Sequence, residues 1–172
     1  MGEDKASKRL PDGQTLLQHT CQSLLACGVD DLLVSGYSQR QYKAVSDIHP
    51  NAGPVSGILS ALHEVANQHL LVMPVDMPCM PVEVLRDLVD FGCENITSCH
   101  FQEQCLPLFI HPHDVDLDNI GQLFEQPRSP SIWKLCHLLS ASSIVAKNPD
   151  SFFNANTPDD WQKVLARLKQ ST

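Results

Sequence analysis

The feature that most constrains the fold is an apolar run, Leu70 to Val75, that ends in a single acidic residue, Asp76. The run has the length and the leucine and valine content of a strand that is buried on both faces of a parallel sheet. Such a strand needs helices on both sides, so the run predicts an α/β fold. Asp76 would then lie at the carboxyl end of the strand, where open α/β sheets bind their ligands.

Asp76 has two interpretations at this point. A lone carboxylate at a strand end is a plausible Mg²⁺ anchor, because Mg²⁺ typically takes one or two protein carboxylates and completes its shell with phosphates and water. The alternative is a turn or helix N-cap aspartate ahead of Pro78. The residue by itself favours neither.

The segments around this run alternate between helix and strand patterns. Apolar residues at helical spacing predict three helices: one from Leu16 to Leu25 with Thr15 before it, one that opens at Gly53-Pro54, and one after Pro81. Asp31 to Gly36 reads as a short buried strand, and a short helix is expected around Gln39 to Ala44. This alternation predicts a mostly parallel sheet with helices on both faces, a three-layer α/β fold.

The second half of the chain is less regular. Two strands are expected at Ile96 to Phe101 and Leu106 to Ile110, joined by the polar residues Gln102 to Gln104. Further apolar patterns predict helices at Leu117–Phe124 and Ile132–Leu139, and a strand at Ser142–Ala146. The last helix starts with Thr157 as N-cap and Pro158 in its first turn.

Composition narrows the function classes. With 172 residues the chain is expected to form one domain, residues 1–172, and its net charge of −8 argues against nucleic-acid binding. No apolar run is long enough for a membrane span, and the first residues do not form a signal peptide. Seven cysteines without a secretory signal indicate a reducing, cytoplasmic location, with Cys21, Cys27 and Cys136 as small buried hydrophobes.

Four short motifs occur in a defined order along nearly the whole chain. They are Met1 to Ala6, Gly53-Pro54-Val55-Ser56-Gly57, Asp76-Met77-Pro78 and Asn154 to Pro158. Together they resemble the ordered motifs of the molybdenum cofactor guanylyltransferases. The resemblance implies a Rossmann-like nucleotidyltransferase fold and transfer of GMP from GTP to the terminal phosphate of molybdenum-bearing molybdopterin, with release of pyrophosphate. It also implies a requirement for Mg²⁺ and contacts with other molybdenum cofactor synthesis proteins and with molybdoenzymes.

The resemblance assigns one group of residues to the nucleotide and the metal. Lys5 matches a lysine that contacts nucleotide phosphates, and Asp76 matches the metal-binding aspartate. Asp47 is the best match to a nucleotide-contacting aspartate, allowing a one-residue gap, and Ser35 stands where an asparagine that contacts the nucleotide is common. Small residues at the Gly-Pro motif let a ligand approach the backbone closely, which adds Gly53 and Gly57.

A second group is assigned to the pterin side of the site. Asn154 and Asn156 match a pair associated with the pterin, and Arg128 is the candidate for its phosphate. Without the resemblance, the two asparagines would be read as turn and helix-capping residues, and Lys5 as a solvated terminal lysine. We expect catalysis by positioning and by neutralisation of phosphate charge, from Asp76 with Mg²⁺ and from Lys5 as a second, mobile cation.

Two alternatives stay open. In the family, a glycine-rich Leu-Ala-Gly-Gly loop and the strand before it precede the Met-Gly motif, so we expect this chain to be incomplete at its N-terminus and to lack both. The first alternative is therefore a non-catalytic homologue that binds the cofactor or a partner protein without turnover. The second is a related nucleotidyltransferase that uses CTP or another acceptor, because base choice depends on that loop and on the surroundings of Ser35.

Overall fold

The structure, a computed structural model, describes residues 5–36 and 41–170, so Met1 to Asp4 of the first motif lie outside the described residues. Its contacts divide the chain into two compact units. Unit 1 consists of Met1–Asp30, Met73–Asp87 and Ala146–Thr172, and unit 2 of Asp31–Val72 and Leu88–Val145. The expectation of a single domain over residues 1–172 stays a prediction.

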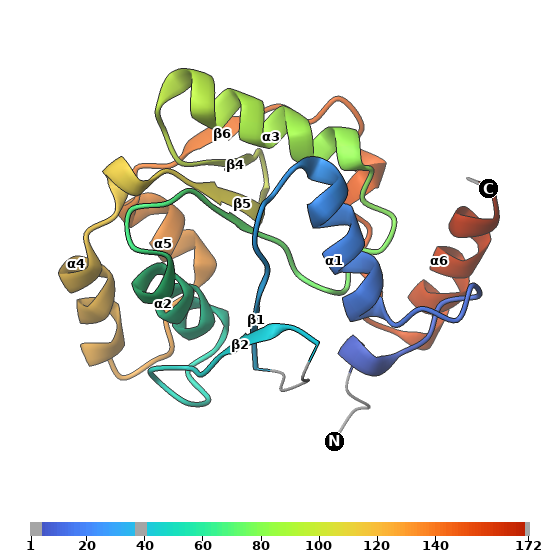
Figure 1. The fold of residues 1–172 in the computed structure, drawn as a ribbon, viewed down its shortest axis with the longest axis horizontal. Coiled ribbons are helices and arrows are strands. Elements are labelled where there is room, and N and C mark those ends of the chain that lie inside the picture. Colours follow the sequence, from blue (N-terminus) through green and yellow to red (C-terminus); the bar gives the residue numbers. More distant parts are fainter. Residues whose placement is uncertain (1–4, 37–40, 171–172) are drawn as a thin grey trace. The chain divides into compact units, whose positions relative to one another are not determined.

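Unit 2 contains the strands (Figure 1). Four of them form a sheet in the order β3-β5-β4-β6: β3 (Leu70–Val72), β5 (Gln104–Ile110), β4 (Cys99–Phe101) and β6 (Ser142–Ile144). Strand β5 runs antiparallel to β3 and β4, whereas β4 and β6 are parallel. Two more strands, β1 (Leu33–Ser35) and β2 (Lys43–Val45), form a separate parallel pair.

The predicted α/β class is confirmed, but the described sheet is mixed rather than mostly parallel. The cause lies in the connection between β4 and β5, where Phe101 pairs with Gln104 and only Gln102 and Glu103 form the turn. Glu103 has a φ of 64°, as the tight turn of a hairpin requires, and so short a loop can only join antiparallel strands.

The strand before Asp76 also differs from the expectation of a central parallel strand. Strand β3 ends at Val72, lies at one end of the described four-stranded sheet and pairs with β5 in the antiparallel sense. Pro74 follows closely and has no N–H to donate to a ladder, which explains why the pairing stops early.

Unit 2 has helices on both faces of its sheet (Figure 1). On one face, Leu108 and Ile110 share a buried apolar core with the helices α2 (Pro54–Val65), α4 (Leu117–Gln122) and α5 (Ile132–Leu138). On the other face, Phe109 lies against Gly92 of α3 (Val82–Asn95). Successive side chains of a strand point to opposite faces of the sheet, so β5 contributes side chains to the core on each side. Unit 2 therefore has the expected three layers.

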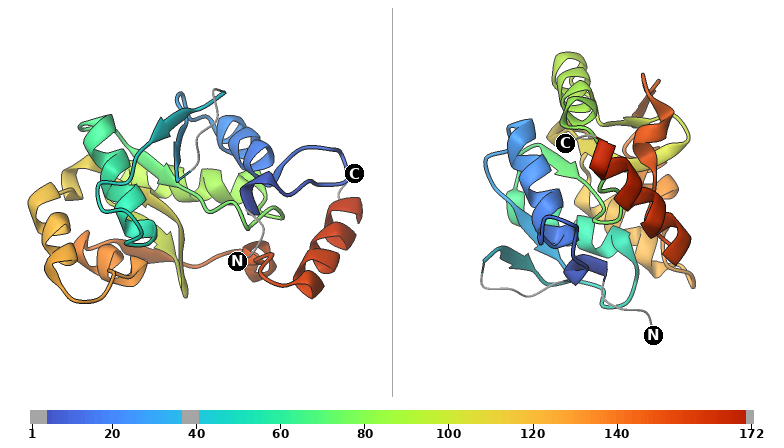
Figure 2. Two further views of the ribbon diagram at one scale, coloured as in Figure 1. Left: turned by 90° about the horizontal axis from the view of Figure 1, so that it is seen from below. Right: turned by 90° about the vertical axis from the view of Figure 1, so that its right-hand side faces the viewer.

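Unit 1 contains α1 (Leu16–Cys27), α6 (Pro158–Gln170) and the first turns of α3. Both complete helices begin at a capping threonine: Thr157, the predicted N-cap, bonds reciprocally with Asp160, and Thr15, which precedes the first predicted helix, does so with Gln18. Hydrogen bonding to the side chain and to the backbone amide of Thr157 lowers the pKa of the Asp160 carboxyl. The N-terminal segment lies beside α6 (Figure 2), where Lys8 Nζ is 4.0 Å from the centre of the Trp161 ring. Within the described residues there are also four short 3₁₀ helices: Lys5–Ser7, Pro112–Asp114, Leu123–Glu125 and Pro149–Phe152.

Two further expectations need correction. The short helix expected at Gln39 to Ala44 is wrong for Gln41 to Ala44, because Lys43–Val45 forms β2 with β1 as its partner, and residues 39 and 40 lie outside the described residues. None of the seven cysteines, which all lie within the described residues, forms a disulfide; Cys21 and Cys136 are buried as expected, but Cys27 is only half-buried. Burial raises the pKa of the Cys136 thiol to about 12.

Among the described helices, none combines the length and apolar character that crossing a membrane requires.

Candidate functional site

Three polar side chains from distant parts of the sequence meet in unit 1. Lys5 Nζ lies 3.2 Å from Asp76 Oδ2 and donates a hydrogen bond of 2.6 Å to Asn156 Oδ1. All three residues were predicted as site residues, and the structure brings them together. We call Lys5, Asp76 and Asn156 the lysine cluster.

The backbone around the lysine cluster is held from two sides. The amide of Ala155 donates to the carbonyl oxygen of Asp76 over 2.8 Å, which joins the Asn154–Asn156 segment to the turn that carries Asp76. A ring nitrogen of His19 in α1 lies 2.9 Å from the carbonyl oxygen of Pro78. Each of these bonds joins residues more than fifty positions apart, so the cluster depends on the fold of unit 1 and not on a local turn.

The lysine cluster is open to a ligand. The side chains of Lys5 and Asp76 are 43% and 23% exposed, and Asp76 lies in a turn, four residues beyond β3 and ahead of α3. The turn interpretation of Asp76 is therefore right about its location. Its carboxylate, however, accepts from Lys5, and together with the Asn156 amide it offers two oxygen atoms to one cation.

A second group of predicted residues meets in unit 2. Ser35 Oγ at the end of β1 donates to Asp47 Oδ1 over 2.8 Å. Gly57 of α2 lies directly behind this pair: a Cβ at position 57 would collide with Ser35 Oγ and lie 3.5 Å from Asp47 Oδ1. A glycine at position 57 is therefore needed for Ser35 to pack this closely. The space next to the Gly57 Cα is occupied by the Ser35 side chain and is not open. We call Ser35, Asp47 and Gly57 the serine–aspartate group.

Gly53 has the open setting that the sequence suggested. It precedes Pro54 at the N-terminus of α2, has a φ of 84°, and would meet no atom within 4 Å if it carried a Cβ. Side chains with a Cβ rarely adopt this backbone conformation, so the residue type is explained by the turn into α2. Its predicted contact with a nucleotide stays a prediction.

The remaining predicted residues are less constrained. Asn154 is half-buried and precedes Ala155, whose amide bonds to Asp76. Arg128 is exposed in the bend between the 3₁₀ helix Leu123–Glu125 and α5. Neither position by itself identifies a ligand.

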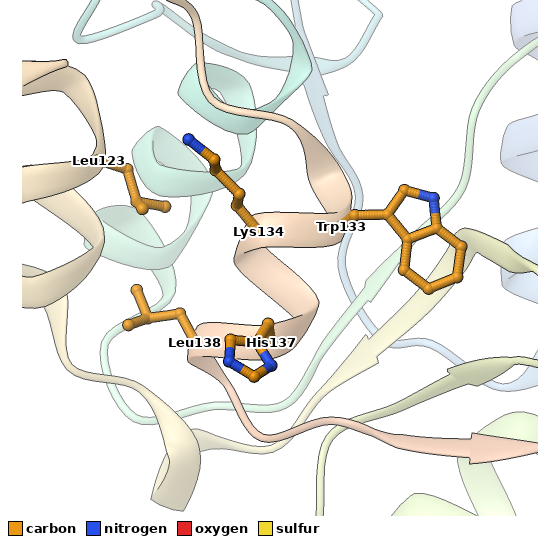
Figure 3. Close-up of a pocket in the computed structure, with 5 residues that line it drawn as sticks. All are labelled: Leu123, Trp133, Lys134, His137 and Leu138. Atoms are coloured by element: carbon orange, nitrogen blue, oxygen red, sulfur yellow. The ribbon is translucent and has the colours of Figure 1, made fainter.

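Two surface hollows of the described part of unit 2 are lined by none of the predicted site residues, although the second includes Ile48 and His49, which directly follow Asp47. One, of about 370 Å³, is lined by Leu123 and by Trp133, Lys134, His137 and Leu138 of α5 (Figure 3). Trp133 points away from Leu123 in this view. The other, of about 440 Å³, lies between α2 and α4 and includes Ile48, His49 and Glu125.

Sequence reasoning counted Ser56 among the small residues of the Gly-Pro motif and gave Ser60 no role, so it missed that both serines of α2 bind the backbone next to Asp47. In the sequence they lie on an apolar helix and look like small core residues. Their only signal was that two hydroxyl groups at i and i+4 share one side of a helix that the pattern buries.

Comparison with known proteins gives one family match and related proteins of similar length. A family model described as "MobA-like NTP transferase domain" matches residues 1–136. The molybdenum cofactor guanylyltransferase of Xanthomonas euvesicatoria pv. vesicatoria is 29% identical over 170 residues, which cover 96% of this chain and 87% of that protein.

Solved structures agree in fold. Molybdopterin-guanine dinucleotide biosynthesis protein A from Archaeoglobus fulgidus superposes with a TM-score of 0.73 at 19% identity, covering 98% of this chain and 92% of the other. The 2-C-methyl-D-erythritol 4-phosphate cytidylyltransferase from Thermus thermophilus has a TM-score of 0.74 at 13% identity, covering 98% and 95%. These matches confirm the predicted Rossmann-like nucleotidyltransferase fold, which is shared by enzymes with different named substrates.

Proposed function

The chain belongs to the MobA-like NTP transferase family, and on that premise we propose that it transfers GMP from GTP to the terminal phosphate of molybdenum-bearing molybdopterin in the cytoplasm. An oxygen of the acceptor phosphate forms a bond to the α-phosphorus of GTP while the bond to the leaving pyrophosphate breaks. The molybdenum cofactor guanylyltransferase similar over nearly the whole chain supports this choice of substrates.

The observation that carries the proposal is the lysine cluster. Lys5, Asp76 and Asn156 come from three of the four motifs that suggested the activity, and they are joined by hydrogen bonds in unit 1. Transfer of a nucleotidyl group asks the protein mainly to position phosphates and neutralise their charge. The Lys5 ammonium group, held between two oxygen acceptors and 43% exposed, is suited to that task.

The donor atoms of the cluster fit Mg²⁺. A carboxylate and an amide oxygen are hard ligands of the kind that this ion takes, and substrate phosphates commonly complete its shell. We assign Asp76 to hold Mg²⁺, which when bound stabilises negative charge on the phosphates. Lys5 donates to both oxygen atoms and is 43% exposed, so its flexible ammonium group can contact a phosphate instead.

The other residues receive separate roles. We assign Ser35, Asp47, Gly53 and Gly57 to the nucleotide, on the strength of the Ser35–Asp47 hydrogen bond and the close packing at Gly57. Asn154, Asn156 and Arg128 are assigned to the pterin substrate. For Asn156 the bond to Lys5 adds support, because it links the pterin assignment to the phosphate-binding lysine.

We expect Gly57→Ala to weaken GTP binding about tenfold, because the new methyl group displaces Ser35 and with it the hydrogen-bonding partner of Asp47. Isothermal titration calorimetry with GTP and Mg²⁺ measures the change. The double variant Ser35→Gly with Gly57→Ala restores space for the methyl group but not the hydroxyl, so its affinity should equal that of Ser35→Gly alone. An unchanged affinity in Gly57→Ala would remove Gly57 from the nucleotide-binding residues.

Nucleotide competition tests the choice of base. We expect GTP to bind at least about tenfold more tightly than CTP in the presence of Mg²⁺, since a site that hydrogen-bonds one base leaves polar groups unpaired with the other. Calorimetric titration with both nucleotides measures this directly. Tighter binding of CTP would overturn the guanylyl assignment in favour of a related cytidylyltransferase.

A turnover assay distinguishes the proposed enzyme from a non-catalytic homologue. With GTP, Mg²⁺ and molybdenum-bearing molybdopterin, we expect release of one pyrophosphate for each guanine dinucleotide formed. Binding of GTP without pyrophosphate release would favour a protein that binds the cofactor without converting it.

A further inference from the structure

Two serine side chains of α2 are buried against the loop that follows Asp47. Ser56 is 0% exposed and Ser60 is 4% exposed, although both carry polar hydroxyl groups. A buried hydroxyl group is unfavourable unless it is hydrogen-bonded, so the partners of these two side chains indicate why they are there.

Both hydroxyl groups bind the backbone of the same loop. The amide of Ile48 donates to Ser60 Oγ over 2.9 Å, and the amide of His49 donates to Ser56 Oγ over 3.0 Å. Ser60 Oγ in turn donates to the carbonyl oxygen of Ser56 over 2.8 Å. That bond uses the proton of the Ser60 hydroxyl group and leaves its lone pairs to accept from Ile48, so the direction of each bond is defined.

Asp47 is the residue directly before the two anchored amides. Its side chain is held by Ser35, through the 2.8 Å bond to Oδ1. The chain from Asp47 to Gly53 forms no helix or strand, so its backbone amides lack the partners that regular structure would supply. Ser56 and Ser60 supply two of them.

We infer that Ser60 and Ser56 are positioning residues for nucleotide binding, which act by holding the loop that carries Asp47. The inference rests on the proposed role of Asp47 in binding the nucleotide. Neither serine needs to touch the nucleotide. Each contributes by keeping the Asp47 carboxylate in one place before the ligand arrives, which reduces the ordering cost of binding.

Ser23 of α1 provides a matched control. It is a helical serine, 9% exposed, whose hydroxyl group donates to the carbonyl oxygen four residues earlier, His19, as that of Ser60 does to Ser56. This bond of Ser23 stays within its own helix, whereas Ser60 also accepts from a loop. Ser23→Ala therefore reports the general effect of removing a buried helical hydroxyl group.

The test compares Ser60→Ala, Ser56→Ala and Ser23→Ala in the full chain, with GTP and Mg²⁺ as the probe. Losing the acceptor removes the serine partner of the Ile48 or His49 amide and frees the loop to move, and we expect the dissociation constant for GTP to rise about tenfold in each α2 variant. Ser23→Ala should leave it unchanged. Amide hydrogen exchange should accelerate at Ile48 in Ser60→Ala and at His49 in Ser56→Ala.

The variant Asp47→Ala separates this inference from the proposed function. If the serines act through Asp47, adding Ser60→Ala to Asp47→Ala should cause no further loss of GTP affinity. Weaker binding in Asp47→Ala with unchanged binding in both α2 serine variants would overturn the positioning role alone. Unchanged binding in Asp47→Ala would overturn the nucleotide role of Asp47 and the inference with it.

Discussion

Asp76→Ala should lower Mg²⁺-dependent turnover by at least about 100-fold while the fold is retained, because it removes the carboxylate assigned to the metal. The fold should survive since Asp76 lies in a turn outside the helices and strands and its ion pair with Lys5 is partly solvated. Exposed ion pairs contribute only ~0–1 kcal/mol to the free energy of unfolding. Initial rates over a range of Mg²⁺ concentrations, together with thermal unfolding, measure both parts of the expectation.

Asp87→Ala is the matched control for Asp76→Ala. Asp87 also forms an ion pair with a lysine in unit 1, Lys147, at 2.8 Å, and its side chain is 41% exposed. Both variants remove one Asp–Lys pair, but only one removes the proposed metal ligand. Turnover should be unaffected in Asp87→Ala, and full Mg²⁺-dependent activity in Asp76→Ala would remove Asp76 from the metal role.

The helices were largely predictable because their signals are local. Thr15 with Gln18, and Thr157 with Pro158 and Asp160, mark two helix starts within four residues of sequence, and the structure has helices at both places. Strand pairing was less predictable because it depends on partners elsewhere in the chain. The run before Asp76 looked like a central parallel strand, yet β3 pairs with β5 across nearly forty residues and in the opposite sense.

The candidate site likewise depends on contacts between distant residues, which local sequence signals do not predict. Lys5 bonds to residues 71 and 151 positions away, and no periodicity or spacing predicts such a contact. The resemblance of the ordered motifs suggested that these residues share a function, and the fold of unit 1 explains how they meet. Ser56 and Ser60 were missed because a hydroxyl group on an apolar helix gives no indication of the backbone amides that will lie opposite it.

Gly92→Ala should destabilise the protein, although alanine is normally the better helix former. In α3, a Cβ at position 92 would collide with the ring of Phe109, which is only 1% exposed and is packed in the sheet. Glycine to alanine in a helix interior usually gains about 1 kcal/mol. Overpacking a filled core costs about 1–3 kcal/mol, and the rigid, enclosed ring leaves little room for relaxation, so we expect a net loss of stability.

Gly121→Ala is the control for the gain from helix propensity, since Gly121 lies in α4 and a Cβ there would meet no atom within 4 Å. It should leave stability unchanged or raise it. The double variant Gly92→Ala with Phe109→Leu tests the cause: replacing the ring with a smaller side chain should make the two changes less costly together than the sum of their separate costs. Urea unfolding of Gly92→Ala, Gly121→Ala, Phe109→Leu and the double variant measures these free energies. Two results would contradict this explanation: additive costs in the double variant, or a Gly92→Ala protein as stable as Gly121→Ala. Either would show that α3 does not need a glycine at position 92 to pack against β5.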